Sequence, residues 1–437
     1  MEATQLVLPF VLGLHNKKIE FTLNSISLRN NKMTPPPPFS VEQWMDQYET
    51  TAKFNLAETC CASISLTELA AFADGGNKSA SELVDLKAIQ NYGDIRGNKE
   101  LRTNLARLYS SKTGTPLPAE NILIQPGAIS ANFLVLYGLI KPGDHVICHH
   151  PTYQQLYSVP ASLGAEVDLW KSNPVNDWLP DFDELKAMVK ENTKLIILNN
   201  PQNPTGQILP KTLLHQIIDF AQLHNIIVFS DEVYRPVFHG ITPVDPEFPP
   251  SILSLGYPNT IATGSLSKAY SLAGIRVGWV ASRNAELIEK CALARDYTTI
   301  SVSQLDQAVA AHALAPDTIH GLLGHNIQLC KTNLELLEKW IIKHDEYCSW
   351  TKPRAGTTAF VKFERDGQPI DAVAFCKALQ EKTGVMFLPG NYGFGDEFKG
   401  YVRIGFANRT NIIKEGLAEA SKFMKKQFDD LPVAAAD

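Results

Sequence analysis

Six short apolar runs, separated by longer amphipathic stretches, constrain the fold of this chain more than any other feature of its sequence. The runs are NILIQ (121–125), HVICHH (145–150), KLIILNN (194–200), IIVFSD (226–231), TIATGS (260–265) and VGWVAS (277–282). Between them, segments such as LKAMVKEN and KTLLHQIIDFAQLH place apolar residues at helical spacing. Short buried strands that alternate with helices predict an α/β fold, with a mainly parallel sheet covered by helices on both faces.

The pattern changes after Ser303. A helical tract runs to about His344, with a break expected near Pro316, and the segments TAFVKFE and YVRIGF then have the composition of strands. A final amphipathic helix is predicted from Ile412 to Phe428. This order of elements predicts a second, smaller α+β domain.

The segment that precedes the apolar runs is expected to join this smaller domain. It opens with SVEQ, which predicts a helix capped by the side chain of Ser40. We therefore predict a large domain at 76–310, a small domain made of 39–75 and 311–430, and a tail at 431–437.

The first 38 residues are predicted to form a flexible arm, because a polar, patternless stretch leads into PPPP at 35–38. The apolar stretch LVLPFVLGL (6–14) is too short to span a bilayer and has no preceding basic residue, unlike a secretory signal. The formal net charge of −6 argues against nucleic acid or an anionic membrane as the main partner. Seven cysteines without a CxxC pair predict neither a metal site nor a disulfide framework, which fits a cytoplasmic protein.

Chemically active residue types follow the apolar runs, where ligands bind to open α/β sheets. After NILIQ comes the small-residue turn PGAIS (126–130), which opens a helix whose free N–H groups suit a phosphate. After HVICHH comes Tyr153, whose ring could lie on a planar ligand. Each feature also has a structural explanation, since a tight turn needs glycine anyway and a single tyrosine is more often a packing residue.

Two further runs also end in polar residues. PQNPTG follows KLIILNN and is predicted to form a rigid loop, in which Pro204 fixes the orientation of the Asn203 amide. We hypothesise that an Asn–Pro bond in this loop is cis. IIVFSD ends with Asp231, and Tyr234 follows it; a carboxylate at the end of a buried strand needs a cationic or N–H partner. A plain turn and a helix cap are the alternative explanations.

The segment after TIATGS combines hydroxyl and basic residues. It contains Ser265, Ser267, Lys268 and Arg276, which together could clamp a phosphate or singly be solvated charges. One ligand accounts for all five signals, namely pyridoxal phosphate. Its aldehyde forms a Schiff base with a lysine, its ring nitrogen needs a carboxylate, and its phosphate needs N–H groups, hydroxyls and an arginine.

The motifs NPQNPTG, SDEVYR, SLSKAYSLAGIRVGW and YVRIGF, in this order, resemble those of the class I/II aminotransferases, the fold-type-I pyridoxal-phosphate enzymes. The resemblance covers roughly residues 40–428 and implies a seven-stranded sheet in the large domain. It further implies that Lys268 forms the Schiff base and shuttles the substrate proton, that Asp231 pairs with the ring nitrogen, and that Tyr153 stacks on the ring.

The same resemblance assigns the remaining groups. Tyr234 and Asn203 would hydrogen-bond the phenolic oxygen of the cofactor, and Arg403 in YVRIGF would bind the substrate α-carboxylate as a fork. The phosphate would be held by Gly127, Ala128, Ile129, Ser265, Ser267 and Arg276. Tyr92, in NYGDIRGNKELR, would reach the phosphate of a second subunit, because sites in this family lie at a homodimer interface. The partners are then an amino acid and a 2-oxo acid.

The substrate end departs from the family pattern. NLAETCCASISLTEL offers Glu58, Thr59, Cys60 and Ser63 where an entry segment with glycine and proline is usual, and it is similar to a subgroup that includes capreomycidine synthase and arginine-oxidising enzymes. Glu58 could read a cationic side chain or be a solvated or capping glutamate. Transamination is the main prediction, and elimination, oxidation or cyclisation of an amino acid, of the arginine type or a biosynthetic intermediate, remains the alternative.

Other classes of protein fit the sequence poorly. A nucleotide-binding protein would carry GxGxxG or GxxxxGK[ST] after a strand, and neither occurs at a strand end here. Transcription regulators of the same fold carry an N-terminal DNA-binding domain, for which the first 38 residues are too short and patternless.

Overall fold

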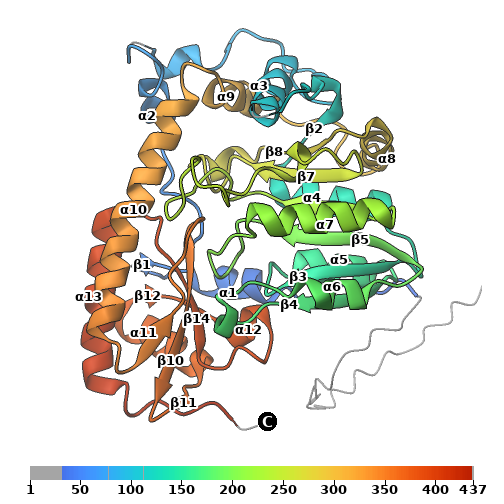
Figure 1. Cartoon of the computed structure of the whole chain (residues 1–437). Coiled ribbons are helices and arrows are strands. Elements are labelled where there is room, and N and C mark those ends of the chain that lie inside the picture. Colours follow the sequence, from blue (N-terminus) through green and yellow to red (C-terminus); the bar gives the residue numbers. More distant parts are fainter. Residues whose placement is uncertain (1–31, 77, 112, 436–437) are drawn as a thin grey trace, which may run out of the picture.

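A computed structural model describes residues 32–76, 78–111 and 113–435, and its centre is a seven-stranded sheet (Figure 1). The strand order is β2-β8-β7-β6-β5-β3-β4. The bounds are β2 Ile122–Gln125, β3 His145–His150, β4 Glu166–Lys171, β5 Thr193–Asn199, β6 Ile227–Asp231, β7 Thr260–Ser265 and β8 Gly278–Ser282. Only β8 runs antiparallel to its neighbours, so the predicted mainly parallel sheet is confirmed.

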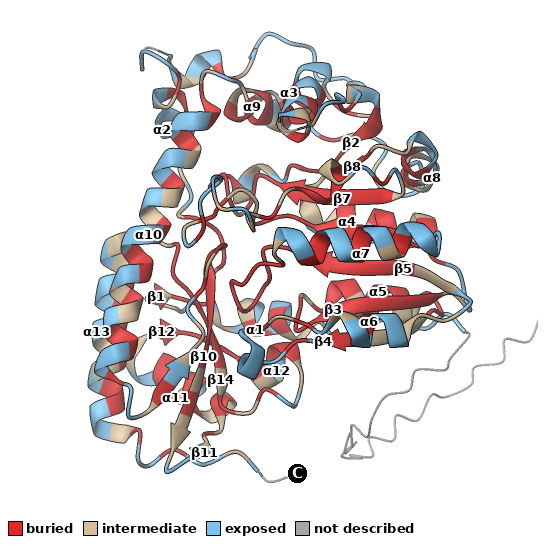
Figure 2. Ribbon diagram, viewed as in Figure 1, coloured by how far each residue is buried: buried red, intermediate tan, exposed pale blue. Residues whose placement is uncertain are grey.

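Helices cover both faces of this sheet because its strands are apolar on both sides. Leu195 and Ile197 of β5 belong to one buried cluster with residues of α4, α5 and α8, whereas Ile196 and Leu198 belong to a second cluster with residues of α7. The bounds are α4 Gly127–Leu139, α5 Gln155–Ser162, α6 Phe182–Met188, α7 Lys211–Leu223 and α8 Ala285–Arg295. Figure 2 shows these strands buried between partly exposed helices.

Two local predictions were incomplete or wrong. Strand β4 was missed because it lies at the edge of the sheet, where half-buried EVDLWK needs no apolar run. Ser40 does not cap helix α1 (Ser40–Tyr48), whose N-cap is Phe39 without a side-chain hydrogen bond. The Ser40 N–H instead donates to the side chain of Gln154, so a long-range partner replaces the local cap.

A second, antiparallel sheet follows the long helical tract, which breaks around Pro316 as expected. Its strands are β9 Cys348–Trp350, β10 Thr358–Arg365, β11 Gln368–Pro369, β13 Leu388–Pro389 and β14 Tyr401–Gly405. The helices that follow β8 and α8 in the chain are α9 Gln304–Ala313, which packs on the segment Lys99–Ser110, and α10 Ile319–Lys343, α11 Ala372–Thr383, α12 Gly390–Phe394 and α13 Thr410–Gln427. Arg403 lies on β14, opposite Phe360 of β10.

The N-terminal segment crosses over to the C-terminal part of the chain and forms a separate two-stranded sheet with it. Strand β1 (Phe54–Asn55) pairs with β12 (Val385–Met386), and the Trp44 indole donates to the carbonyl of Phe387. The remaining elements are α2 Leu66–Ala71, α3 Lys99–Ser110 and the short 3-10 turns Ala80–Glu82, Ala119–Asn121, Pro174–Asn176, Ile252–Ser254 and Ala273–Ile275. This crossing places α1 and residues 57–60 over the ends of the central strands.

No helix in the described ranges combines the length and the apolar character that a bilayer crossing needs. Residues 1–31 of the predicted arm lie outside the described residues. Of the rest of the arm, Thr34 donates to the carbonyl of Ser162, and the carbonyl of Pro38 accepts from Gln154.

Candidate active site

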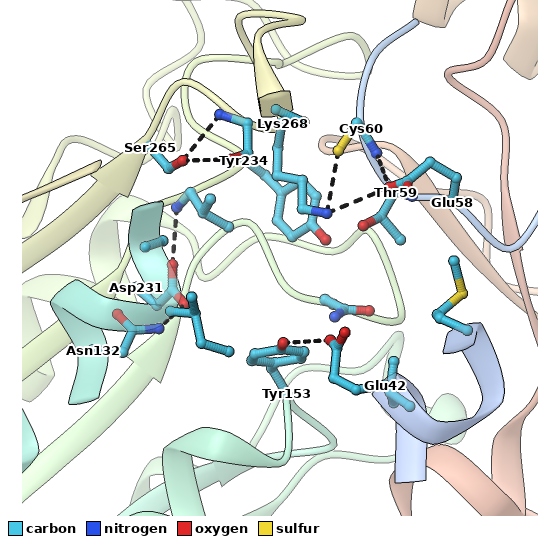
Figure 3. Close-up of a pocket in the computed structure, with 18 of the residues that line it drawn as sticks. Glu42, Glu58, Thr59, Cys60, Asn132, Tyr153, Asp231, Tyr234, Ser265 and Lys268 are labelled. Atoms are coloured by element: carbon cyan, nitrogen blue, oxygen red, sulfur yellow. Dashed lines mark hydrogen bonds and ion pairs between the residues drawn. The ribbon is translucent and has the colours of Figure 1, made fainter. Parts of the chain in front are cut away.

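A cavity of about 310 Å³ lies at the carboxyl ends of β5, β6 and β7, under α1 and residues 57–60. Every predicted site residue except Gly127 and Tyr92 lines it. These are Glu58, Ala128, Ile129, Tyr153, Asn203, Asp231, Tyr234, Ser265, Ser267, Lys268, Arg276 and Arg403. Figure 3 shows side chains from distant segments pointing into this one space.

The turn at Gly127 forms one end of the cavity and has the features of a phosphate site. Gly127 has φ of 80°, and a Cβ there would lie 2.6 Å from Nη2 of Arg276. Arg276 Nη1 donates to Ser267 Oγ at 3.3 Å, and Ser265 Oγ donates to Ser267 Oγ at 2.8 Å. A guanidinium, two hydroxyls and the N-terminus of α4 therefore meet at one place, where an anion is stabilised.

Asp231 is a buried carboxylate that neighbouring groups hold in a fixed orientation. Oδ2 accepts from Asn132 Nδ2 at 2.9 Å, and Oδ1 accepts from the Val233 N–H at 3.0 Å. Burial raises the pKa of Asp231, and these hydrogen bonds partly oppose the increase. A carboxylate of this kind is stabilised by a cationic N–H group, which a protonated pyridine nitrogen supplies.

The partners of Asp231 were missed in the sequence. Thr263 Oγ1 donates to Asn132 Oδ1 at 2.6 Å, so a chain of hydrogen bonds runs from Thr263 through Asn132 to Asp231. Spacing could have placed both residues near the predicted site, although not as partners of Asp231. Asn132 lies one helical turn after Ala128, and Thr263 precedes Ser265 by two positions on the same strand.

Arg403 forms the opposite wall with Asn203 and Tyr234. Its Nη1 donates to Asn203 Oδ1 at 3.2 Å and its Nη2 to the carbonyl of Ala57 at 2.9 Å. The Nε of this buried side chain has no hydrogen-bond partner among the described residues. The Asn200–Pro201 and Asn203–Pro204 bonds beside it are both cis, as hypothesised for this loop. An unpaired N–H on a buried guanidinium favours an anionic ligand.

Lys268 lies between the two ends of the cavity. Its Nζ is 3.5 Å from Glu58 Oε1 and 3.4 Å from Cys60 Sγ (Figure 3). Burial acts to lower the pKa of Lys268, but Cys60 and Glu58 outweigh it and the pKa is raised. Because burial also raises the pKa of Cys60 to about 12, the thiol is neutral at neutral pH, and Glu58 is the charge that acts on the lysine.

Backbone hydrogen bonds stabilise the negative charge of Glu58. Its Oε1 accepts from the N–H groups of Thr59 at 2.6 Å and Cys60 at 2.8 Å. Burial acts to raise the pKa of Glu58, yet Lys268 and these hydrogen bonds lower it to about 2. The side chain is therefore ionised at every physiological pH.

Two more carboxylates from α1 line the substrate end and were not predicted. Glu42 Oε1 accepts from the Tyr153 hydroxyl at 2.6 Å, and Glu49 lies on the same face of the helix. Burial is the largest cause that raises the pKa of Glu49, and repulsion from Glu58 and Glu42 raises it further. The spacing of Glu42, Met45 and Glu49 is that of one helix face, a signal which could have found them.

Tyr92 does not approach this cavity. Its side chain is 78% exposed and lies in a separate hollow with residues 301–304. The structure contains a single chain, so the predicted contact of Tyr92 with a second subunit stays a prediction.

The residues present fit pyridoxal phosphate. The Gly127 cradle suits its phosphate, Asp231 suits its ring nitrogen, and the Lys268 amine lies between them and Arg403. An α/β protein with this arrangement at its strand ends has the fold and site of a pyridoxal-phosphate enzyme of fold type I.

The chain belongs to the family "Aminotransferase class I and II", whose family model matches residues 71–419. It is a pyridoxal-phosphate-dependent enzyme. A solved structure of a PLP-dependent aminotransferase from Streptococcus suis has 38% sequence identity and a TM-score of 0.81, with 90% of this chain and 99% of that chain covered.

Two curated relatives are more distant in sequence. Capreomycidine synthase of Streptomyces vinaceus is 27% identical, with 88% of this chain and 93% of the relative covered. Arginine–pyruvate transaminase of Pseudomonas aeruginosa is also 27% identical, with 74% and 80% covered. The predicted family, fold class and cofactor are thus confirmed.

Proposed function

We propose that this enzyme transfers the amino group of an amino acid with a cationic side chain to a 2-oxo acid. The observation that carries the proposal is the position of the Lys268 amine, in one cavity with the buried guanidinium of Arg403 and the ionised carboxylate of Glu58. An amino acid of this type carries a carboxylate, an amine and a distal cation, and each group has a complementary side chain there.

The cofactor would be held at four points. Gly127, Ala128, Ile129, Ser265, Ser267 and Arg276 hold the phosphate. Asp231 pairs with the ring nitrogen, Tyr153 covers the ring, and Tyr234 with Asn203 donates to the phenolic oxygen. When bound, the cofactor supplies an electron-accepting ring that stabilises the charge left at the substrate α-carbon.

The protein's own groups then orient the substrate and move its proton. Arg403, whose Nε has no partner among the described residues, binds the substrate α-carboxylate as a fork. The Lys268 amine takes the proton from the α-carbon, for which it must be uncharged. Glu58 opposes this by raising the pKa of Lys268. A substrate cation that pairs with Glu58 reduces that effect and favours the neutral amine.

The preference for a cationic side chain rests on the charge of the substrate end. Glu42, Glu49 and Glu58 line it together, and the pKa of Glu49 is raised by burial and by the other two carboxylates. Lys268 is the basic side chain paired with Glu58, and it loses its charge when it joins the cofactor or acts as a base. The relative named arginine–pyruvate transaminase agrees with this preference.

A lyase, oxidase or cyclase acting on an amino acid is the second candidate. It is favoured by the likeness to capreomycidine synthase, which covers 93% of that relative. These reactions also begin with removal of the α-proton, so Lys268, Asp231 and Arg403 would keep their roles.

We also propose a homodimer in which Tyr92 completes the site of the other subunit. Ile89, Tyr92, Phe133, Tyr137 and Tyr297 are large side chains at least 39% exposed. They form two groups of neighbouring segments, since α4 packs on α8, and Asn91 accepts a hydrogen bond from Gln304. Burial of these side chains against a second copy would stabilise a dimer. A cytoplasmic location is proposed because the seven cysteines are free.

The reaction is tested by incubating the holoenzyme with arginine, lysine, ornithine, leucine and aspartate, with and without pyruvate or 2-oxoglutarate. We expect a new amino acid to form only when the 2-oxo acid is present, and basic substrates to have the highest kcat/KM. Ammonia, peroxide or a cyclic product formed without a 2-oxo acid would replace transamination by the second candidate. Preference for neutral or acidic amino acids would reject the proposed side-chain recognition.

A further inference from the structure

A second cavity of about 480 Å³ lies behind the active site and shares its walls. Glu232, Tyr270 and Trp279 line it, and they follow the active-site residues Asp231, Lys268 and Arg276 by one, two and three positions. Each of these three chain segments therefore contributes one residue to the active site and another to the second cavity. The cavity is within the size range of small-ligand sites.

The polar end of this cavity is a buried carboxylate. Glu232 is 4% exposed, and its Oε1 accepts from the Ile252 N–H at 2.8 Å. Its Oε2 has no hydrogen-bond partner at normal distance among the described residues, because Arg235 Nε, 3.5 Å away in the turn after β6, forms an ion pair without a hydrogen bond. The Ser251 hydroxyl, which also lines the cavity, acts to lower the pKa of Glu232 against the effect of burial. The Arg235 guanidinium instead donates to the carbonyl of Pro249 and lies 5.0 Å from the centre of the Phe238 ring. A buried oxygen with no donor requires a water or a ligand.

The walls beside Glu232 are aromatic. Tyr109, Tyr270 and Trp279 are all buried, and the Trp279 indole donates to the Tyr109 hydroxyl at 2.9 Å. Flat rings suit a flat ligand, and the faces of aromatic rings attract cations. The side formed by α10 includes Gly324, where an added Cβ would meet no atom within 4 Å.

We propose that this cavity is a second ligand site, which takes a planar nitrogen cation of the amidinium or guanidinium class. Two N–H groups of such a cation reach the Glu232 carboxylate, including the Oε2 that lacks a donor, and the aromatic side chains cover its apolar body. The site is independent of the transamination proposed above. Since Glu232 is bonded to Asp231, occupation is expected to shift the visible absorbance of the bound cofactor.

The test uses the holoenzyme and three probes of one shape: benzamidine, which is cationic at neutral pH, neutral benzamide and anionic benzoate. Calorimetric titration is expected to give one site for benzamidine, binding about tenfold weaker or worse for benzamide, and none for benzoate. Benzamidine lacks the aliphatic amine that condenses readily with the cofactor, so the calorimetric signal reports binding.

Two variants alter the proposed site in different ways. Glu232→Gln keeps the shape but removes the charge, and is expected to weaken benzamidine binding at least tenfold. Gly324→Leu fills the cavity from a helix position with free space, keeps Glu232, and is expected to abolish binding. Glu338→Gln, which breaks the exposed ion pair with Lys352, is the matched control and should change nothing.

Three results would overturn the proposal. The first is the absence of benzamidine binding to the wild-type holoenzyme, which leaves a water-filled cavity. The second is benzamidine binding that persists in Gly324→Leu. This variant tests the proposal even if Glu232→Gln does not fold. The third is binding that Glu58→Gln abolishes, because it would place the probe in the active site instead.

Discussion

The two ends of the active-site cavity are built in different ways. At the cofactor end, the Gly127 turn, Asp231 and Ser265 follow directly from strands of one sheet, and hydrogen bonds hold each group in place. At the substrate end, α1, residues 57–60 and Arg403 come from opposite ends of the chain and bring unbalanced carboxylates together. The fixed groups of the cofactor end serve a reaction that is the same for every substrate. The groups of the substrate end can differ, and a difference there changes which substrate is bound.

The largest effect should come from the amine that both ends share. Replacing Lys268 with alanine is expected to lower turnover by roughly 10³-fold or more, because it removes both the covalent link and the base. Reduction with borohydride followed by peptide mass spectrometry should tag Lys268 in the wild type and no residue in Lys268→Ala. Lys352→Ala, an exposed lysine, is the control. Intact turnover in Lys268→Ala would refute the assignment for both ends.

The next largest effect should be confined to the cofactor end. Asp231→Asn is expected to cost about 10²- to 10³-fold in kcat, because the fixed carboxylate no longer stabilises the charge on the ring nitrogen. Asn132→Ala removes the donor to Asp231 Oδ2 and should give a smaller loss. Steady-state kinetics should find both losses equal for basic and neutral substrates. A change in substrate preference would show that the two ends are not separable.

Glu58→Gln should act on the substrate end alone. We expect kcat/KM for basic amino acids to fall by about 10- to 100-fold, since a buried charge-assisted hydrogen bond is lost. The value for leucine should not fall, because leucine has no cation to pair with Glu58 and the variant removes the charge that raises the pKa of Lys268. An unaltered ratio of basic to neutral substrates would remove Glu58 from substrate recognition.

The smallest effect on turnover near neutral pH should come from two buried histidines at the end of β3, which act on acid stability instead. Burial lowers the pKa of His149 to about 3 and that of His150 to about 4. Both values are below that of an unfolded histidine, near 6.5. The unfolded chain therefore takes up protons first, and stability is retained above about pH 6.5 and lost as the pH falls towards 4.

Glu58 makes no contribution in the upper part of this range. Its folded pKa is lowered to about 2, so its stabilisation is present above the ordinary value of 4.5 and is lost only below it. Thermal midpoints of the cofactor-free protein, in which Lys268 keeps the charge that lowers the pKa of Glu58, should fall less steeply between pH 6.5 and 4.5 in His149→Phe than in the wild type. Glu58→Gln should keep the wild-type slope, and an unchanged slope in His149→Phe would contradict the explanation.

The sequence alone predicted almost all of the residues that line the proposed cofactor end of the cavity. The residues predicted to bind the cofactor end an apolar run, lie within a few positions of one or sit in a glycine turn, and parallel strands bring their carboxyl ends to one edge of a sheet. Local order was thus sufficient for Asp231, Ser265 and Lys268. It was not sufficient for Asn132 and Thr263, whose polar atoms are recognisable as partners only once α4 lies against β7.

Only the tertiary structure decided the substrate end. The carboxylates of Glu42 and Glu49 meet Glu58 because β1 pairs with β12 and carries α1 across the molecule. No spacing along the chain encodes that meeting, since the contact depends on packing between segments more than 300 positions apart. The same holds for Glu232, whose unpaired oxygen becomes visible only where α3, α10 and the loop after β6 enclose one space. Sequence shows which residues are adjacent along the chain. The charge balance of a cavity depends on every segment that lines it, and only the tertiary structure brings those segments together.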